Sequence, residues 1–126
     1  MTAGKFRGSC VLVVEDDALI ALLLQDMLTD LGCATVRLAG SPDQAFALIE
    51  RDRFDAALLD VNLHGGKTSY AIADRLIERG APFAFLTGYG EGGVDPAYRG
   101  VAVLTKPIDD SSLKAALEAL VAPKEQ

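Results

Sequence analysis

The sequence has few of the residues that bind zinc or form disulfides. Its 126 residues include two cysteines and one histidine, and Cys10 and Cys33 are not spaced like metal ligands. A disulfide-rich scaffold and a thiolate metal centre are therefore excluded. Each cysteine lies at the start of an apolar segment, so we expect two buried free thiols in preference to a disulfide.

The sequence also lacks a long apolar run and an excess of positive charge. No stretch approaches the roughly 20 apolar residues of a membrane span. The first apolar run, residues 10–14, is cut off by three acidic residues, which does not fit a signal peptide. The formal charge is -6, so the surface should repel nucleic acids and anionic membranes. We expect a cytoplasmic protein that binds neither nucleic acid nor membrane.

No internal repeat and no low-complexity linker divides the chain. A length of 126 residues suits one compact domain. We expect residues 1–9 to form a flexible N-terminal lead, residues 10–122 to form the domain, and residues 123–126 to form a tail. No separate output domain is expected.

Short apolar runs rich in β-branched residues alternate with segments of helical periodicity. Strands are predicted at residues 10–14, 34–38, 54–59, 82–86 and 101–104. Helices are predicted after the caps Asp17 and Ser41, and over residues 68–79 and 109–121. Before the last strand the chain is short and rich in glycine, so the fourth helix should be a stub. This alternation predicts an α/β domain with one parallel sheet and helices on both faces.

Acidic, hydroxyl and ammonium side chains follow the predicted strands. Sites in open parallel sheets form outside the carboxyl ends of the strands, so these side chains should converge. Clustered carboxylates favour a divalent cation, and a lysine and a threonine can bind the oxygens of a phosphoryl group. Alone, each residue is more often a helix cap or a solvated charge, but together they indicate phosphoryl chemistry. In chain order they are Glu15, Asp16, Asp17, Asp60, Thr87 and Lys106.

Four short motifs resemble those of response-regulator receiver domains. The match runs from about residue 11 to residue 121, with the motifs in the family's order. The resemblance implies a single doubly wound (βα)5 flavodoxin-like domain with a parallel five-stranded sheet in the order 2-1-3-4-5 and a short or irregular fourth helix. The motifs are Val11-Leu-Val-Val-Glu-Asp-Asp17, Leu58-Leu-Asp-Val-Asn62, Phe85-Leu-Thr-Gly88 and Leu104-Thr-Lys-Pro107.

The resemblance also implies a phosphoacceptor. Asp60 would take a phosphoryl group from a sensor histidine kinase or a histidine phosphotransfer protein, and Thr87 and Lys106 would bind its oxygens. The bond between Lys106 and Pro107 would be cis. The protein would catalyse only its own phosphorylation and slow dephosphorylation. It would signal to a downstream protein partner, or act as a shuttle or sink for phosphoryl groups.

A Mg²⁺ site is implied by the same resemblance. Glu15 and Asp16 would hold the ion together with Asp60, and the backbone carbonyl of Asn62 would complete the protein's share of the ligands. Asp17 falls where the first helix should begin, so it is not assigned to the metal.

Some positions depart from the common receiver pattern. Receivers often carry a tyrosine or phenylalanine three residues before the lysine, where this chain has Val103. The segment Phe85-Leu-Thr-Gly-Tyr89 is similar to a Phe-x-Thr-Gly subfamily that includes many stand-alone regulators of alphaproteobacteria, which work with a non-standard class of histidine kinases. Tyr89 would either cover the acyl phosphate or have a packing role for its ring. His64 is interpreted as a plain loop residue and not as a phosphorelay histidine.

Three other functions compete with this interpretation. A haloacid-dehalogenase-like phosphatase would need a second aspartate where Asn62 stands. A flavin or nucleotide module would need glycines or hydroxyls after the first strand, where three acidic residues stand instead. A pseudo-receiver that only binds proteins would not need the full set of polar residues.

Overall fold

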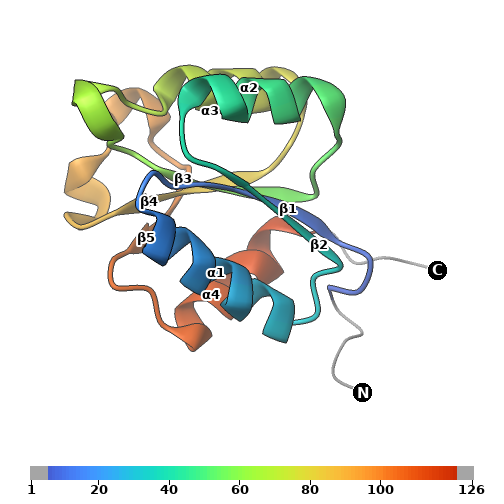
Figure 1. Ribbon diagram of the computed structural model, residues 1–126. Helices are drawn as coiled ribbons and strands as arrows, with labels where there is room; N and C mark the ends of the chain where they lie inside the picture. Colours follow the sequence, from blue (N-terminus) through green and yellow to red (C-terminus); the bar gives the residue numbers. More distant parts are fainter. Residues whose placement is uncertain (1–5, 122–126) are drawn as a thin grey trace.

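Five parallel strands form one twisted sheet through the centre of the protein (Figure 1). The computed structural model describes residues 6–121. The sheet order is β2-β1-β3-β4-β5, which confirms the predicted order. The strands are β1 (Cys10–Val14), β2 (Thr35–Ala39), β3 (Ala56–Asp60), β4 (Phe83–Thr87) and β5 (Ala102–Thr105).

Four α-helices cover the two faces of the sheet. They are α1 (Ala18–Asp30), α2 (Pro42–Arg51), α3 (Tyr70–Glu78) and α4 (Asp110–Leu120). Figure 1 shows α2 and α3 on one face and α1 and α4 on the other, so the predicted doubly wound α/β fold is confirmed. Asp17 and Ser41 cap α1 and α2 as predicted, because their side chains accept backbone N–H groups of the first turn. No helix within residues 6–121 is long and apolar enough to cross a membrane.

Two short 3₁₀ turns take the place of a fourth crossover helix. Between β4 and β5, the described chain forms η2 (Gly90–Gly93) and η3 (Pro96–Tyr98) instead of an α-helix. Asp95 caps η3 by accepting the N–H of Ala97 at 2.9 Å. A third 3₁₀ turn, η1 (His64–Gly66), follows β3. The predicted short, irregular fourth helix is therefore confirmed.

The sheet separates two apolar cores. Successive side chains of a strand point to opposite faces, so alternate residues of β1 enter different cores. Leu12 and Val14 pack beneath α2 and α3, whereas Val11 and Val13 pack beneath α1 and α4. All four are fully buried, with 0% of their surface exposed. This double burial holds the carboxyl ends of the central strands in fixed positions.

Two sequence predictions need correction at this level. Phe6 was assigned to a flexible lead, but its side chain is 2% exposed and packs in the core beneath α1 and α4. The backbone N–H of Ser9 donates a hydrogen bond to the carbonyl of Phe6 and closes this turn. Cys33 is buried as predicted, but Cys10 is only half-buried, and both thiols are free. They belong to the cores on opposite faces of the sheet. The rest of the predicted lead (residues 1–5), the last residue of the predicted domain (Ala122) and the predicted tail (residues 123–126) lie outside the described residues.

Candidate functional site

Three carboxylates meet at the carboxyl ends of β1 and β3. These strands are parallel neighbours with Val14 opposite Leu59, so the residues that follow them come together. One oxygen from each of Glu15, Asp16 and Asp60 lies within 4.8 Å of the others. Glu15 and Asp60 are buried, with 3% and 8% of their surface exposed. The result is a compact group of hard oxygen ligands at the edge predicted from the sequence.

Lys106 enters the same group from the end of β5. Its Nζ lies 3.0 Å from Oε1 of Glu15 and 3.1 Å from Oδ2 of Asp60. The long side chain spans the width of the intervening strand β4, while the backbone N–H of Lys106 donates to the carbonyl of Thr87 at 2.8 Å. The bond to Pro107 is cis, as the resemblance implied. Lys106 therefore bridges Glu15 and Asp60.

In this group, burial and the neighbouring charged groups shift the pKa values in opposite directions. Burial raises the pKa of Glu15, although hydrogen bonds from Lys106 and from the N–H of Asp17 act against it. Burial alone would lower the pKa of Lys106, but the hydrogen bonds to Glu15 and Asp60 outweigh it, so that pKa lies above its ordinary value. The group thus holds three carboxyl groups beside an ammonium that contacts two of them. A site with this excess of acidic groups favours a divalent cation.

Asp16 has a partner that the sequence did not reveal. The backbone N–H of His64 donates to Oδ2 of Asp16 at 2.5 Å, and the imidazole Nδ1 lies against the same oxygen. His64 was predicted to be a plain loop residue, and no sequence signal links it to a residue 48 positions earlier. Asp17 caps α1 instead of joining the cluster, as predicted. Asn62 pairs with Thr68 in an isolated bridge just beyond β3.

Thr87 ends β4 and faces the segment that follows it. Its side chain is buried, and Oγ1 accepts the N–H of Tyr89 at 3.0 Å. Gly93 of η2 folds back onto this hydroxyl, because a Cβ added at Gly93 would lie 2.4 Å from Oγ1. The Tyr89 ring does not pack into a core, since the residue is 79% exposed. The hydroxyl is thereby linked to the backbone of η2.

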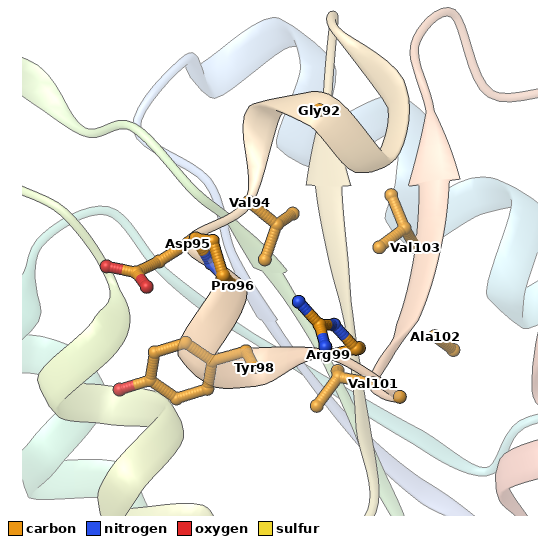
Figure 2. A pocket seen from close by; sticks show the side chains of 10 residues that line it. Gly92, Val94, Asp95, Pro96, Tyr98, Arg99, Val101, Ala102 and Val103 are labelled. Carbon is orange, nitrogen blue, oxygen red and sulfur yellow. The ribbon is translucent and has the colours of Figure 1, made fainter.

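An open groove lies beside β5, and its lining shares no residue with the acidic group. It has a volume of about 570 Å³ and is bounded by η2, η3 and the start of β5. Figure 2 shows Val94 and Val103 flanking the hollow and the Tyr98 ring turned away from it. Val103 is half-buried and occupies the position where many receivers carry an aromatic ring.

Tyr98 instead packs with other aromatic side chains. Its ring stacks on Tyr70 with centroids 4.9 Å apart and contacts the edge of Phe85 at 5.6 Å. Its hydroxyl donates to Oδ1 of Asp74 on α3 at 2.6 Å. In return, the Tyr70 hydroxyl accepts the N–H of Asp95 at 2.8 Å. We call Tyr70, Asp74, Asp95 and Tyr98 the tyrosine clasp, because these contacts fasten η3 to α3.

The sequence is similar to that of one known protein family. Residues 11–118 match the response regulator receiver domain, which is most of the chain. The chain belongs to this family. The fold, the sheet order and the acidic edge all agree with that membership.

Several known proteins resemble this receiver. SdrG from Sphingomonas melonis Fr1 is 40% identical, with a TM-score of 0.80 over 90% of this chain and 96% of SdrG. A second SdrG structure, described as the BeF3-activated conformation from Pseudomonas melonis Fr1, is 39% identical, with a TM-score of 0.79 over 92% of this chain and 98% of that one. PhyR from Brucella abortus has a TM-score of 0.80 over 95% of this chain and 50% of PhyR, but at 24% identity it shows likeness of fold alone.

A curated relative is longer than this receiver. The transcriptional regulatory protein PdtaR of Mycobacterium tuberculosis is 32% identical over 114 residues, which are 88% of this chain and 56% of PdtaR. The chain therefore spans little more than half of that relative.

Proposed function

We propose that this receiver accepts a phosphoryl group on Asp60 in a Mg²⁺-dependent reaction, with a sensor histidine kinase or a histidine phosphotransfer protein as donor. The observation that carries the proposal is the position of the Asp60 carboxylate at the end of β3. There it meets Lys106 at 3.1 Å and two further carboxylates whose oxygens lie within 4.8 Å. Phosphoryl transfer needs little more than positioning and charge neutralisation, which these groups can supply.

The residues present fit a magnesium ion. Ligands of one Mg²⁺ lie about 2.1 Å from it, so neighbouring ligands are about 3.0 Å apart and opposite ones about 4.2 Å apart. The three carboxylate oxygens lie within 4.8 Å of one another, so they would share an ion after moving closer together, or with a water bridging one of them to the metal. Glu15, Asp16, Asp60 and the carbonyl of Asn62 would hold it. When bound, Mg²⁺ would neutralise charge on the phosphoryl group and orient one of its oxygens.

The chain's own side chains would perform the transfer. The carboxylate of Asp60 attacks phosphorus, a P–O bond forms, and the P–N bond of the donor phosphohistidine breaks with its electron pair staying on the imidazole. The ammonium of Lys106 would then pair with a phosphoryl oxygen in place of Asp60 Oδ2. The hydroxyl of Thr87 accepts from Tyr89 but still has its own proton to donate to another oxygen.

The main alternative is a pseudo-receiver that binds proteins without phosphotransfer. A half-buried lysine shared by two buried carboxylates is costly to keep, and interaction with a partner alone does not require it. The phosphatase alternative still lacks the second aspartate, since Asn62 occupies that position.

The same proposal includes a more specific assignment within the receiver family. The Phe85-Leu-Thr-Gly-Tyr89 motif and the 40% identity to SdrG over 96% of its length support a stand-alone cytoplasmic regulator of the Phe-x-Thr-Gly type. Such a regulator acts on a downstream protein partner, or serves as a phosphoryl shuttle or sink. The BeF3-activated conformation described for SdrG supports the use of BeF3 as a mimic of the phosphorylated state here.

The test is phosphorylation by acetyl phosphate, a small donor that needs no cognate kinase. We expect the wild-type protein to be labelled only when Mg²⁺ is present, and Asp60→Asn to lose labelling. Asp26→Asn is the matched control, because Asp26 is an exposed carboxylate on α1 outside the cluster. Labelling of Asp60→Asn at the wild-type rate would show that another residue is the acceptor.

A further inference from the structure

The single histidine of the sequence lies over the acidic cluster. His64 begins η1 in the loop after β3, and Gly65 and Gly66 continue that loop with φ values of 76° and 74°. This left-handed backbone, which favours glycine, turns the loop back toward the end of β1. The turn brings both the N–H and the ring of His64 onto Asp16.

Both contacts from His64 reach the same carboxylate oxygen. Oδ2 of Asp16 receives the backbone N–H at 2.5 Å and the imidazole Nδ1 beside it. Among the described residues, no donor contacts Oδ1 of Asp16, so this oxygen is left for a ligand. A carboxylate anchored through one oxygen can no longer turn freely about its two side-chain bonds.

We propose that His64 is a positioning residue, which holds Asp16 through Oδ2 so that Oδ1 is presented to Mg²⁺. The inference rests on the proposed function, because it concerns the same metal site. Mg²⁺ demands near-ideal octahedral geometry, so a ligand held in place binds it better than a mobile one. Hydrogen-bond partners behind metal ligands typically change metal affinity by about 10- to 100-fold when they are removed.

The geometry favours positioning over a packing role. The His64 side chain is 82% exposed, so its ring contributes little to either core, whereas the Asp16 side chain beneath it is 13% exposed. The hydrogen bond to Oδ2 comes from the backbone N–H of His64, and Nδ1 of the ring lies against the same oxygen. A neutral imidazole that carries its proton on Nδ1 would present an N–H to that carboxylate. Because the backbone N–H of His64 survives substitution by any residue except proline, the expected effect lies near the lower end of that range.

The experiment is a Mg²⁺ titration followed by amide chemical shifts, which does not depend on phosphorylation. We expect His64→Leu to weaken Mg²⁺ binding about tenfold. His64→Asn keeps a side-chain N–H near the position of Nδ1, and we expect its affinity to stay within about twofold of wild type. Thermal melting without Mg²⁺ should be the same for all three proteins.

The outcomes separate this inference from the proposed function. Asp16→Ala removes a proposed ligand and should weaken binding at least as much as His64→Leu. If wild type and His64→Leu bind Mg²⁺ equally, or the leucine variant binds more tightly, the positioning role of His64 is wrong while the metal site stands. Failure of His64→Asn to restore affinity would also overturn the role. Absence of Mg²⁺ binding to the wild-type protein would overturn the metal site and the inference together.

Discussion

Lys106 is shared between two carboxylates that are almost fully buried. The side chains of Glu15 and Asp60 are 1% and 11% exposed, and both contact the same Nζ. Removing one partner of such a group leaves charges without compensation, which costs more than the pair itself contributes. The ammonium therefore stabilises the unphosphorylated fold as well as taking part in the proposed chemistry.

We predict that Lys106→Met lowers the free energy of unfolding by about 1–3 kcal/mol without Mg²⁺. The estimate is below the cost of breaking a fully buried pair, because 25% of the Lys106 side chain is exposed and water can reach the gap. Mg²⁺ should stabilise the variant more than the wild type, since it replaces the missing positive charge. Urea unfolding with and without Mg²⁺ measures both effects. Equal stability of the two proteins without Mg²⁺ would contradict the role of Lys106.

At the scale of elements, η3 is attached to α3 by polar contacts of aromatic residues. The hydrogen bond to Asp74, followed by burial, raises the pKa of Tyr98 to about 12. The ordinary value is 10.0, so the folded protein keeps the phenol protonated over a pH range in which the unfolded chain loses it. The tyrosine clasp thus depends on a proton that strong alkali removes.

We predict that the clasp opens as the pH rises through the range from 10 to about 12. The folded-state pKa of Tyr98 is raised, so its stabilising contribution is complete below pH 10 and is lost toward pH 12. Absorbance titration of tyrosinate measures this, and Tyr98→Phe identifies the late step. In Asp74→Ala the Tyr98 step should move down toward its ordinary pKa. An unchanged titration curve in that variant would show that Asp74 does not protect the proton.

At the scale of the whole molecule, the polar edge of the sheet is linked to the segment between β4 and β5. Thr87 joins the end of β4 to η2, and Gly93 lies directly against its hydroxyl. Val103 carries no ring that could turn, since a β-branched side chain has few rotamers and little surface to move. Movement of Thr87 toward a phosphoryl group would therefore pull first on residues 88–93.

We predict that residues 88–93 are mobile in the free protein and that residues 88–100 exchange amide hydrogens more slowly when Asp60 carries BeF3. The change should be largest in residues 88–93, because the tyrosine clasp already holds η3 in the free state. Hydrogen exchange with and without BeF3 and Mg²⁺ measures it, and Asp60→Asn under the same conditions is the control. Equal exchange in both forms would mean that the segment is permanently flexible and carries no signal.

The sequence predicted the sheet and the polar groups at its edge for a local reason. Apart from β2, each strand is a short apolar run that ends at or just before a charged or hydroxyl residue, and parallel strands bring such ends together. The contact between His64 and Asp16 was missed because it depends on a turn at Gly65 and Gly66 and on packing between distant segments.

Two further features could not be predicted from a local sequence pattern. The stacking of Tyr70 on Tyr98 joins residues from separate elements. The burial of Phe6 could not be predicted from its neighbours, because a single aromatic residue in a polar stretch has no periodicity to interpret. Its side chain packs in the core beneath α1 and α4. The roles of the site residues stay predictions, because the structure shows where the side chains lie and not which reaction they perform.

The separation of Glu15 and Lys106 by 91 residues also has a consequence for synthesis of the chain. A nascent chain that has left the ribosome only as far as β4 has all its clustered carboxylates but not their ammonium. In such a chain the carboxylates would lack the ammonium that contacts Glu15 and Asp60 in the complete fold. We therefore expect the proposed phosphorylation to require a docked β5, so that incomplete chains would not draw phosphoryl groups from the donor.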